Sequence, residues 1–382
     1  MSLRTRNGAV LFGVESTPGT PETLTAGTHA VLVENPQINF NPQNVQTNEV
    51  TGSLDNRGPI VGGLQVSVTF DVYMKGSGSA GTAPEVGALL KCCGWSETVT
   101  ATAVPATAEA LGSGASQTAA TLGASASGTA QAYRGMPVEF STTVTGWSFI
   151  TNYTTGKVAT LTDDMGATLT TTTDYQIPVN VLYGPTSSSI NAGTLELFQD
   201  GLKYKLTGCR GNMSVNLTAA GPGRFSFTFS GIMVSKTDVA VPSATYDSTR
   251  PPIWKNARSS LERVTAAIGT LTLDNGNTVV YPENPTATEG FDVSEITERG
   301  MSGNIDPAAT LIATRDILTN MTAGTSGILL AGWGTAGGNR VGLTVPTALY
   351  TDDSPGDRQG IMTENIPYSA IGQDAGAFIC FY

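Results

Sequence analysis

Strict alternation of apolar and polar residues is the sequence feature that most constrains the fold of this chain. Within Leu64 to Tyr73 (LQVSVTFDVY) every second residue from Val66 to Val72 is a valine or phenylalanine, and the residues between them are polar. The segment Phe225 to Ile232 (FSFTFSGI) alternates in the same way, with three phenylalanines on one side. Because successive side chains of a strand point to opposite faces of a sheet, both segments are predicted to be strands with one buried face.

The composition extends this prediction to the whole chain. Of 382 residues 45 are glycine and only 13% are charged, which is typical of short strands joined by many turns. Two short helices are expected, at Glu85 to Cys93 after Pro84 and at Arg315 to Thr322. We therefore predict an all-β fold with one or two short helices, long enough for two or three domains.

Changes in pattern along the chain predict its domain organisation. Residues 105–131 consist mainly of Ala, Ser, Gly and Thr, and they are interpreted as a flexible linker or weak strands. The strand pattern then returns, with Tyr175 to Tyr183 as one strand. The predicted parts are an N-terminal arm (1–29), a first β-domain (30–102 and 185–235), an inserted outer β-domain (103–184), a linker (236–265) and a second β-domain (266–382).

Two predicted turns and one internal similarity, called here the echo, indicate how some of these segments are connected and related. Gln199-Asp200-Gly201 and Asp274-Asn275-Gly276-Asn277 each lie between extended segments and are predicted to close hairpins. Asn35-Pro36 followed by Phe40 resembles Asn284-Pro285 followed by Phe291. The echo suggests that the first and second β-domains are copies of one duplicated unit.

Charge and apolar runs exclude several classes of protein. The net charge is -11, and residues 265–382 alone hold 13 acidic and 4 basic residues, a balance of -9. A protein that grips nucleic acid through its phosphates needs the opposite sign. No apolar run approaches about 18 residues, so neither a membrane span nor an export signal is predicted. The four cysteines lack metal-ligand spacing and are expected to be reduced and buried.

Each residue whose type suits catalysis or metal binding has a simpler interpretation. His29 is the only histidine, and it lies in a Gly/Thr-rich stretch without cysteine or carboxylate neighbours. Asp352, Asp353 and Asp357 do not fit the calcium-loop spacing and are read as a solvated turn. The glycines of KGSGSAG, Gly76, Gly78 and Gly81, fit neither phosphate-binding pattern. No nucleophile elbow is present, so no catalytic, cofactor-binding or metal-binding residue is predicted.

Three stretches carry a resemblance to a known family. They are AVLFGVESTPGTPETL, VTFDVYMKGSGSAGTAPEVGALLKCCGWSET and LELFQDGLKYKLTGCRGNMSVNLTAAGPGRFSFTFSGI. Together, in this order and spacing, they resemble the major tail tube proteins of long-tailed, siphovirus-like bacteriophages, best over residues 9–102 and 194–235. The stretch from QAYRGMPVEF to TTDYQIPVNVLYGP is similar to β-modules inserted in phage structural proteins. The insert and the extra C-terminal third depart from a single-domain tube protein.

The resemblance implies a non-enzymatic subunit of the virion tail that assembles in the host cytoplasm. Its sheets would join across copies into a β-barrel ring, and stacked rings would form the conduit for genome delivery. A ring would hold three chains if the duplication is real and six if it is not. The implied partners are copies of itself, the tape-measure protein, the tail terminator and the distal tail proteins, with DNA passing through unbound. The loop Asn41 to Arg57 and the N-terminal arm would reach the next ring.

Exposed strand edges give this reading a physical basis, since closure into a ring removes them. We also hypothesise that part of the acidic excess in residues 265–382 faces the channel and repels DNA, the alternative being a role in solubility alone. Two rival functions remain open. A surface adhesin or receptor-binding β-protein would have a similar composition. A polysaccharide-degrading enzyme would need paired carboxylates in a cleft and an aromatic platform, whereas Trp95, Trp147, Trp254 and Trp333 are widely scattered.

Overall fold

The computed structural model describes residues 3–4, 6–47, 49–50, 52–55 and 57–382. These residues contain 26 strands and two short helices. The strands form sheets of 18, six and two strands, and every strand pair is antiparallel. The all-β prediction is confirmed. Its two helices also lie close to their predicted places, α1 at Gly87–Cys92 and α2 at Ile317–Ala323.

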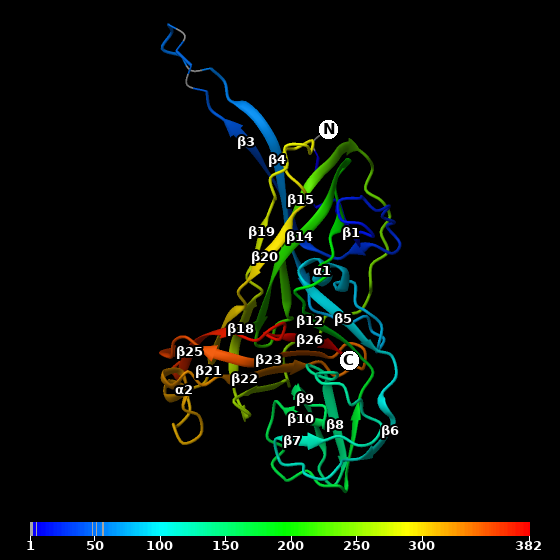
Figure 1. The fold of residues 1–382 in the computed structure, drawn as a ribbon, viewed down its shortest axis with the longest axis vertical. Coiled ribbons are helices and arrows are strands. Elements are labelled where there is room, and N and C mark those ends of the chain that lie inside the picture. The colour runs from blue at the N-terminus through cyan, green and yellow to red at the C-terminus, as the bar shows by residue number, and fades with distance from the viewer. Residues whose placement is uncertain (1–2, 5, 48, 51, 56) are drawn as a thin grey trace.

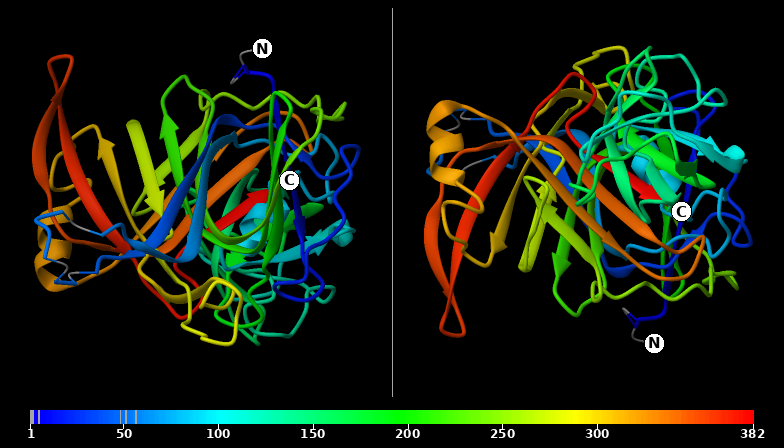
Figure 2. Two further views of the ribbon diagram at one scale, coloured as in Figure 1. Left: turned by 90° about the horizontal axis from the view of Figure 1, so that it is seen from above. Right: turned by 90° about the horizontal axis from the view of Figure 1, so that it is seen from below.

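Eight strands of the largest sheet form one continuous curved surface (Figures 1 and 2). Its first half has the spatial order β3 (Glu34–Val45), β4 (Ile60–Tyr73), β15 (Arg224–Asp238) and β14 (Leu202–Thr218). The second half follows in the order β18 (Ile268–Asp274), β21 (Ser302–Pro307), β25 (Ile361–Ala370) and β24 (Ser354–Arg358). The pairing of β14 with β18 joins the halves.

The alternating strands bury the face that their sequences predict. Phe225, Phe227 and Phe229 on β15 are at most 1% exposed, and the last two pack against Phe70 of β4 on the same side of the sheet. The sheet bends at an irregularity in β14 between Thr207 and Arg210, which lets further strands fold over this apolar side. Those strands are β13 (Gly193–Gln199), β1 (Gly8–Val14) and β2 (Ala30–Val31).

A second group of strands covers the apolar side of the other half. Pairing runs through β5 (Trp95–Thr100), β12 (Asn180–Pro185), β26 (Phe378–Phe381), β23 (Val341–Tyr350), β22 (Gly327–Trp333), β16 (Arg258–Leu261) and β17 (Val264–Thr265). Side chains from both groups belong to one continuous hydrophobic core. The two halves of the curved sheet therefore share a core.

The six-stranded sheet lies at the opposite end of the long axis from the β3–β4 hairpin (Figure 1). Its strands in spatial order are β6 (Val104–Ala110), β11 (Thr173–Ile177), β8 (Pro137–Thr142), β9 (Gly146–Tyr153), β10 (Val158–Leu161) and β7 (Ala119–Thr121). Of the two alternatives for residues 105–131, a flexible linker or weak strands, the structure shows strands, since β6 and β7 belong to this sheet. Buried Leu111, Ala120 and Leu122 anchor this segment despite its small, polar composition.

One strand predicted inside the insert belongs to the main sheet. The segment Tyr175 to Tyr183 is two strands, because Pro178 has no amide hydrogen and separates β11 from β12. β11 stays in the six-stranded sheet, whereas β12 pairs with β5 and β26. The range 103–184 thus includes strands of two different sheets.

The hairpin predicted at Asp274 to Asn277 is wrong. β18 ends at Asp274, but β19 (Asn277–Val280) does not return along it and pairs instead with β20 (Glu295–Arg299). β18 has β14 and β21 as its neighbours, so tertiary pairing outweighs the local turn signal. The turn at Gln199-Asp200-Gly201 is confirmed, since it joins β13 to β14 in register.

The predicted arm and linker also contain strands. Residues 8–14 form β1, whose Val10, Leu11 and Phe12 are at most 2% exposed and which pairs along its whole length with β13. This part of the range 1–29 is therefore core rather than arm, while Met1, Ser2 and Thr5 lie outside the described residues. In the range 236–265, β15 continues to Asp238 and β16 and β17 occupy the far end.

Candidate assembly surface

The curved eight-stranded sheet has one face that the rest of the chain leaves uncovered except near Arg210 and Asn212, where the β19–β20 hairpin packs, and it is called here the open face. Its side chains are mostly hydroxyls and amides, and they alternate with the core residues of each strand. They are Glu34, Gln37, Asn39 and Asn41 on β3, Gln65, Ser67, Thr69, Asp71 and Tyr73 on β4, Arg224, Ser226, Thr228 and Ser230 on β15, Asn212, Ser214, Asn216 and Thr218 on β14, Thr270, Thr272 and Asp274 on β18, Ser302, Asn304 and Asp306 on β21, Asn365, Pro367 and Ser369 on β25, and Ser354, Gly356 and Arg358 on β24.

The open face carries few charges. From the acidic excess of residues 265–382 it holds Asp274 and Asp306, and Asp306 is paired with Arg358 at 3.2 Å. Glu34, Asp71 and Arg224 add two acidic groups and one basic group on the first half, with Glu34 3.4 Å from Arg224. A face of this kind offers hydrogen-bonding groups to water and gives a polyanion neither strong attraction nor strong repulsion.

The eight strands end in two open edges. Within the described residues, β3 pairs only with β4, and β24 pairs only with β25. The β24–β25 hairpin projects from the body in the view from above (Figure 2), and the β3–β4 hairpin projects furthest along the long axis (Figure 1). Each edge presents backbone N–H and C=O groups that can pair with another strand, and natural proteins usually cover or block such edges.

Exposed apolar side chains gather on the same projections. On the β3–β4 hairpin they are Val45, Val50, Leu54, Ile60 and Val61. Ile361 and Met362 extend the β24–β25 hairpin, and Leu311 and Ile312 lie in the loop before α2. Contiguous exposed apolar groups on a soluble chain mark contact sites. Of the loop Asn41 to Arg57 that was expected to reach a neighbour, Asn48, Thr51 and Asn56 lie outside the described residues.

The two halves of the sheet repeat one arrangement. In the first, chain order β3, β4, α1, β14, β15 gives the spatial order β3-β4-β15-β14. In the second, chain order β18, β21, α2, β24, β25 gives β18-β21-β25-β24. The counterpart of β3 is therefore β18, and the counterpart of β14 is β24. The sequence echo matched different residues, since Asn35 lies on β3 whereas Asn284 follows β19.

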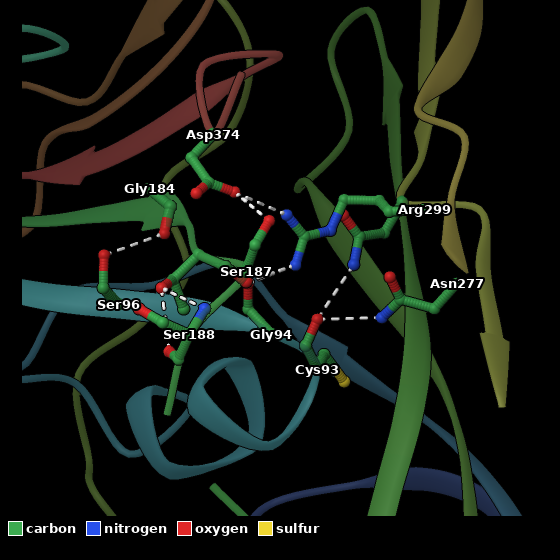
Figure 3. Close-up of polar contacts among 11 residues, drawn as sticks. Cys93, Gly94, Ser96, Gly184, Ser187, Ser188, Asn277, Arg299 and Asp374 are labelled. Atoms are coloured by element: carbon green, nitrogen blue, oxygen red, sulfur yellow. Dashed lines mark hydrogen bonds and ion pairs between the residues drawn. The ribbon is translucent and has the colours of Figure 1, made fainter. Parts of the chain in front are cut away.

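The β19–β20 hairpin is held in place by two side chains (Figure 3). Arg299 donates from Nη2 to the carbonyls of Gly94 and Thr186 at 2.9 and 2.7 Å, and its Nη1 lies 3.5 Å from Asp374. Asn277 donates to the Cys93 carbonyl at 2.9 Å. Burial lowers the pKa of Arg299, while Asp374 opposes that shift. These contacts join the hairpin to the end of α1 and to the loops that follow β12 and β25, and the sequence held no signal for them.

The residues considered earlier for chemistry lie apart from one another. The Nδ1 atom of His29 accepts a hydrogen bond from the Thr25 amide at 3.1 Å. Asp352 and Asp353 occupy the turn before β24, and Asp357 lies on that strand. Gly76 packs against Gly338 and donates to Asn339 at 2.9 Å, so its loop is filled by protein. In the described part of the chain no cluster of three or more histidine, cysteine or acidic residues is placed to hold a metal.

The four cysteines are confirmed as buried, and none forms a disulfide. Burial raises the pKa of every one of these thiols. Among the described residues no helix is long and apolar enough to span a bilayer.

Comparison with known proteins does not assign this chain to a family. No protein-family model matches this chain, and no curated protein matches its sequence.

Proposed function

We propose that the chain is a structural, non-enzymatic subunit that closes into rings with copies of itself, and that stacked rings form a phage tail tube. The observation that carries the proposal is the curved eight-stranded sheet, which has an open edge at each end and a polar open face between them. Such a sheet loses both edges when copies join side by side around a ring.

The junction inside the chain supplies a template for the junction between chains. β14 pairs antiparallel with β18, matching open-face residues with open-face residues, for example Asn216 with Thr272. Since β24 is the counterpart of β14 and β3 the counterpart of β18, β24 of one copy would pair antiparallel with β3 of the next. Aligning the centres of their open-face residues places Gly356 opposite Asn39, Ser354 opposite Asn41 and Arg358 opposite Gln37.

Each chain already contributes two copies of the four-strand arrangement. A ring of three chains would then hold six such arrangements, related by approximate sixfold symmetry, and we propose three chains per ring. The open face would line the channel, so DNA would pass over hydroxyl and amide side chains. The exposed valines and leucine of the β3–β4 hairpin would contact the next ring, a head-to-tail interface that repeats along a tube.

Cysteine pairs test the proposed junction. We expect the variant carrying both Asn41→Cys and Ser354→Cys to form disulfides between copies on mild oxidation, because opposed Cβ atoms in antiparallel strands lie roughly 4.5 to 5.5 Å apart. On a denaturing gel, the largest disulfide-linked species should contain three chains. A limit of six would retain the ring and reject our subunit number, and a continuous ladder would reject closure.

A face-reversed variant is the control. Pro355 adjoins Ser354 but points to the other side of β24, so the pair Asn41→Cys with Pro355→Cys should link poorly. A second pair, Gln37→Cys with Arg358→Cys, detects the same junction at its other end. Failure of both open-face pairs in particles that electron microscopy identifies as rings would refute the proposed strand pairing. Persistent monomers or slender fibres would refute the tube.

A further inference from the structure

Lys75, Glu85 and Asp247 form a buried charged cluster that the proposed assembly does not use. Lys75 follows β4, Glu85 precedes α1, and Asp247 lies on the strandless segment 239–252, which crosses back over this region. The Lys75 side chain is only 4% exposed, that of Glu85 12% and that of Asp247 24%. Three segments far apart in sequence thus bring one amine and two carboxyl groups together.

The polar atoms of the cluster are close and directed. Lys75 Nζ lies 3.1 Å from Glu85 Oε1 and 3.7 Å from Asp247 Oδ2, and it donates to the Asp247 carbonyl at 2.9 Å. Asp247 Oδ1 accepts a hydrogen bond from the Thr249 amide at 2.8 Å. This arrangement holds the Asp247 carboxyl with one oxygen bound by a backbone N–H and the other toward the amine. A backbone donor placed in this way stabilises the negative oxygen that develops when a carboxyl group is attacked.

Burial raises the free energy of this cluster when all three groups are charged. One ammonium with two carboxylates leaves an uncompensated negative charge in a largely dry site. Burial is the main reason that the pKa of Glu85 is raised, Asp247 raises it further, and Lys75 opposes both effects. Buried Glu85 Oε1 has the Lys75 ammonium, 3.1 Å away, as its ion-pair partner. A carboxyl group in this state can carry a proton between neighbouring atoms.

We propose that Lys75 and Asp247 form an isopeptide bond, with Glu85 carrying the protons. The Lys75 Nζ–Asp247 Cγ bond forms and the Cγ–Oδ2 bond breaks. Two of the three ammonium protons leave with Oδ2 as one water molecule, so the reaction needs no oxidant, energy source or other reactant. The amide replaces the buried ammonium and one carboxylate with a neutral group, which removes most of the desolvation cost. Fixed proximity of the two groups lowers the barrier to their reaction.

The bond would fix segment 239–252 to the rest of the chain. Segment 239–252 contains no strand, yet it connects β15 to β16 and packs Val241, Ala244 and Tyr246 on a small apolar cluster with β1. A covalent link to Lys75 would hold this segment against the end of β4. The link belongs to a single chain and does not depend on ring formation.

Mass spectrometry of the purified, denatured full-length protein tests the proposal. We expect a mass one water molecule below that of the sequence, and a protease-derived peptide in which Lys75 is joined to Asp247. A mass equal to that of the sequence would overturn the inference. A link mapped to Glu85 would overturn it equally, because it would exchange the proposed roles of the two acids.

Three variants separate the link from other losses of water. Lys75→Arg should restore the full mass, whereas a cyclised aspartate would keep its mass deficit in this variant and refute the lysine link. Glu85→Gln should leave the chain unlinked while its circular dichroism remains native. Asp247→Asn should release ammonia instead of water and end at the same mass as the linked parent, which a purely structural ion pair would not do. Lys91→Arg, which alters the more exposed pair with Glu97, should leave the mass deficit of one water molecule unchanged and is the matched control.

Discussion

The replacement Phe227→Ala tests which side of the curved sheet is core. Phe227 is 1% exposed, and its ring centroid lies 5.7 Å from that of Phe229 and 5.8 Å from that of Phe70. Transfer of such a ring from water to the interior contributes about 1.5 to 3 kcal/mol. The cavity left behind and the lost ring contacts raise the expected destabilisation to about 3 to 5 kcal/mol.

Thr228→Ala is the matched control, because Thr228 is the next residue on β15 and lies on the open face. It should change the free energy of unfolding by no more than about 0.5 kcal/mol. Guanidinium unfolding of the unassembled chain, followed by tryptophan fluorescence, measures both. Equal costs for the two variants would refute the assignment of faces, and with it the polar lining that we propose for the channel.

Three further results are expected. Arg299→Ala should speed amide exchange in β19 and β20 by loosening the hairpin, and unchanged exchange would show that the arginine contacts do not hold it. The four buried thiols should react with a thiol reagent only after denaturation, and rapid reaction of the native protein would contradict their burial. Burial raises the pKa of Tyr153 from 10.0 to about 12. The folded state holds this proton more tightly, so the stabilisation is complete below pH 10 and is lost as the pH rises toward 12. A Tyr153→Phe variant that loses stability over that range as steeply as the parent would contradict this assignment.

Local sequence patterns predicted individual elements well where side-chain periodicity was strong. The alternation in Leu64 to Tyr73 and in Phe225 to Ile232 identified strands and their buried faces, since period two has no other regular explanation. Pro84 and the following apolar residues likewise identified α1. Where the composition is dominated by small residues, as in residues 105–131, the sequence left a flexible linker and weak strands as alternatives, and a few buried side chains favour the strands.

The partners of each strand lay beyond the reach of the sequence. Asp274 to Asn277 has good hairpin chemistry, yet β18 pairs with β14 along one edge and with β21 along the other, which leaves no free edge for β19. Glu85 and Asp247 are ordinary surface residues by type, and only the return of segment 239–252 over Lys75 brings them together.

The sequence by itself therefore determined the fold class, the strongest strands, the two helices and the buried state of the cysteines, because these follow from local periodicity and apolarity. Only the tertiary structure decided that two four-strand arrangements join into one curved sheet, which edges stay open and which charges meet. These properties depend on pairing between distant segments, where backbone hydrogen bonds are the same for every sequence and the packing of whole faces selects the partner.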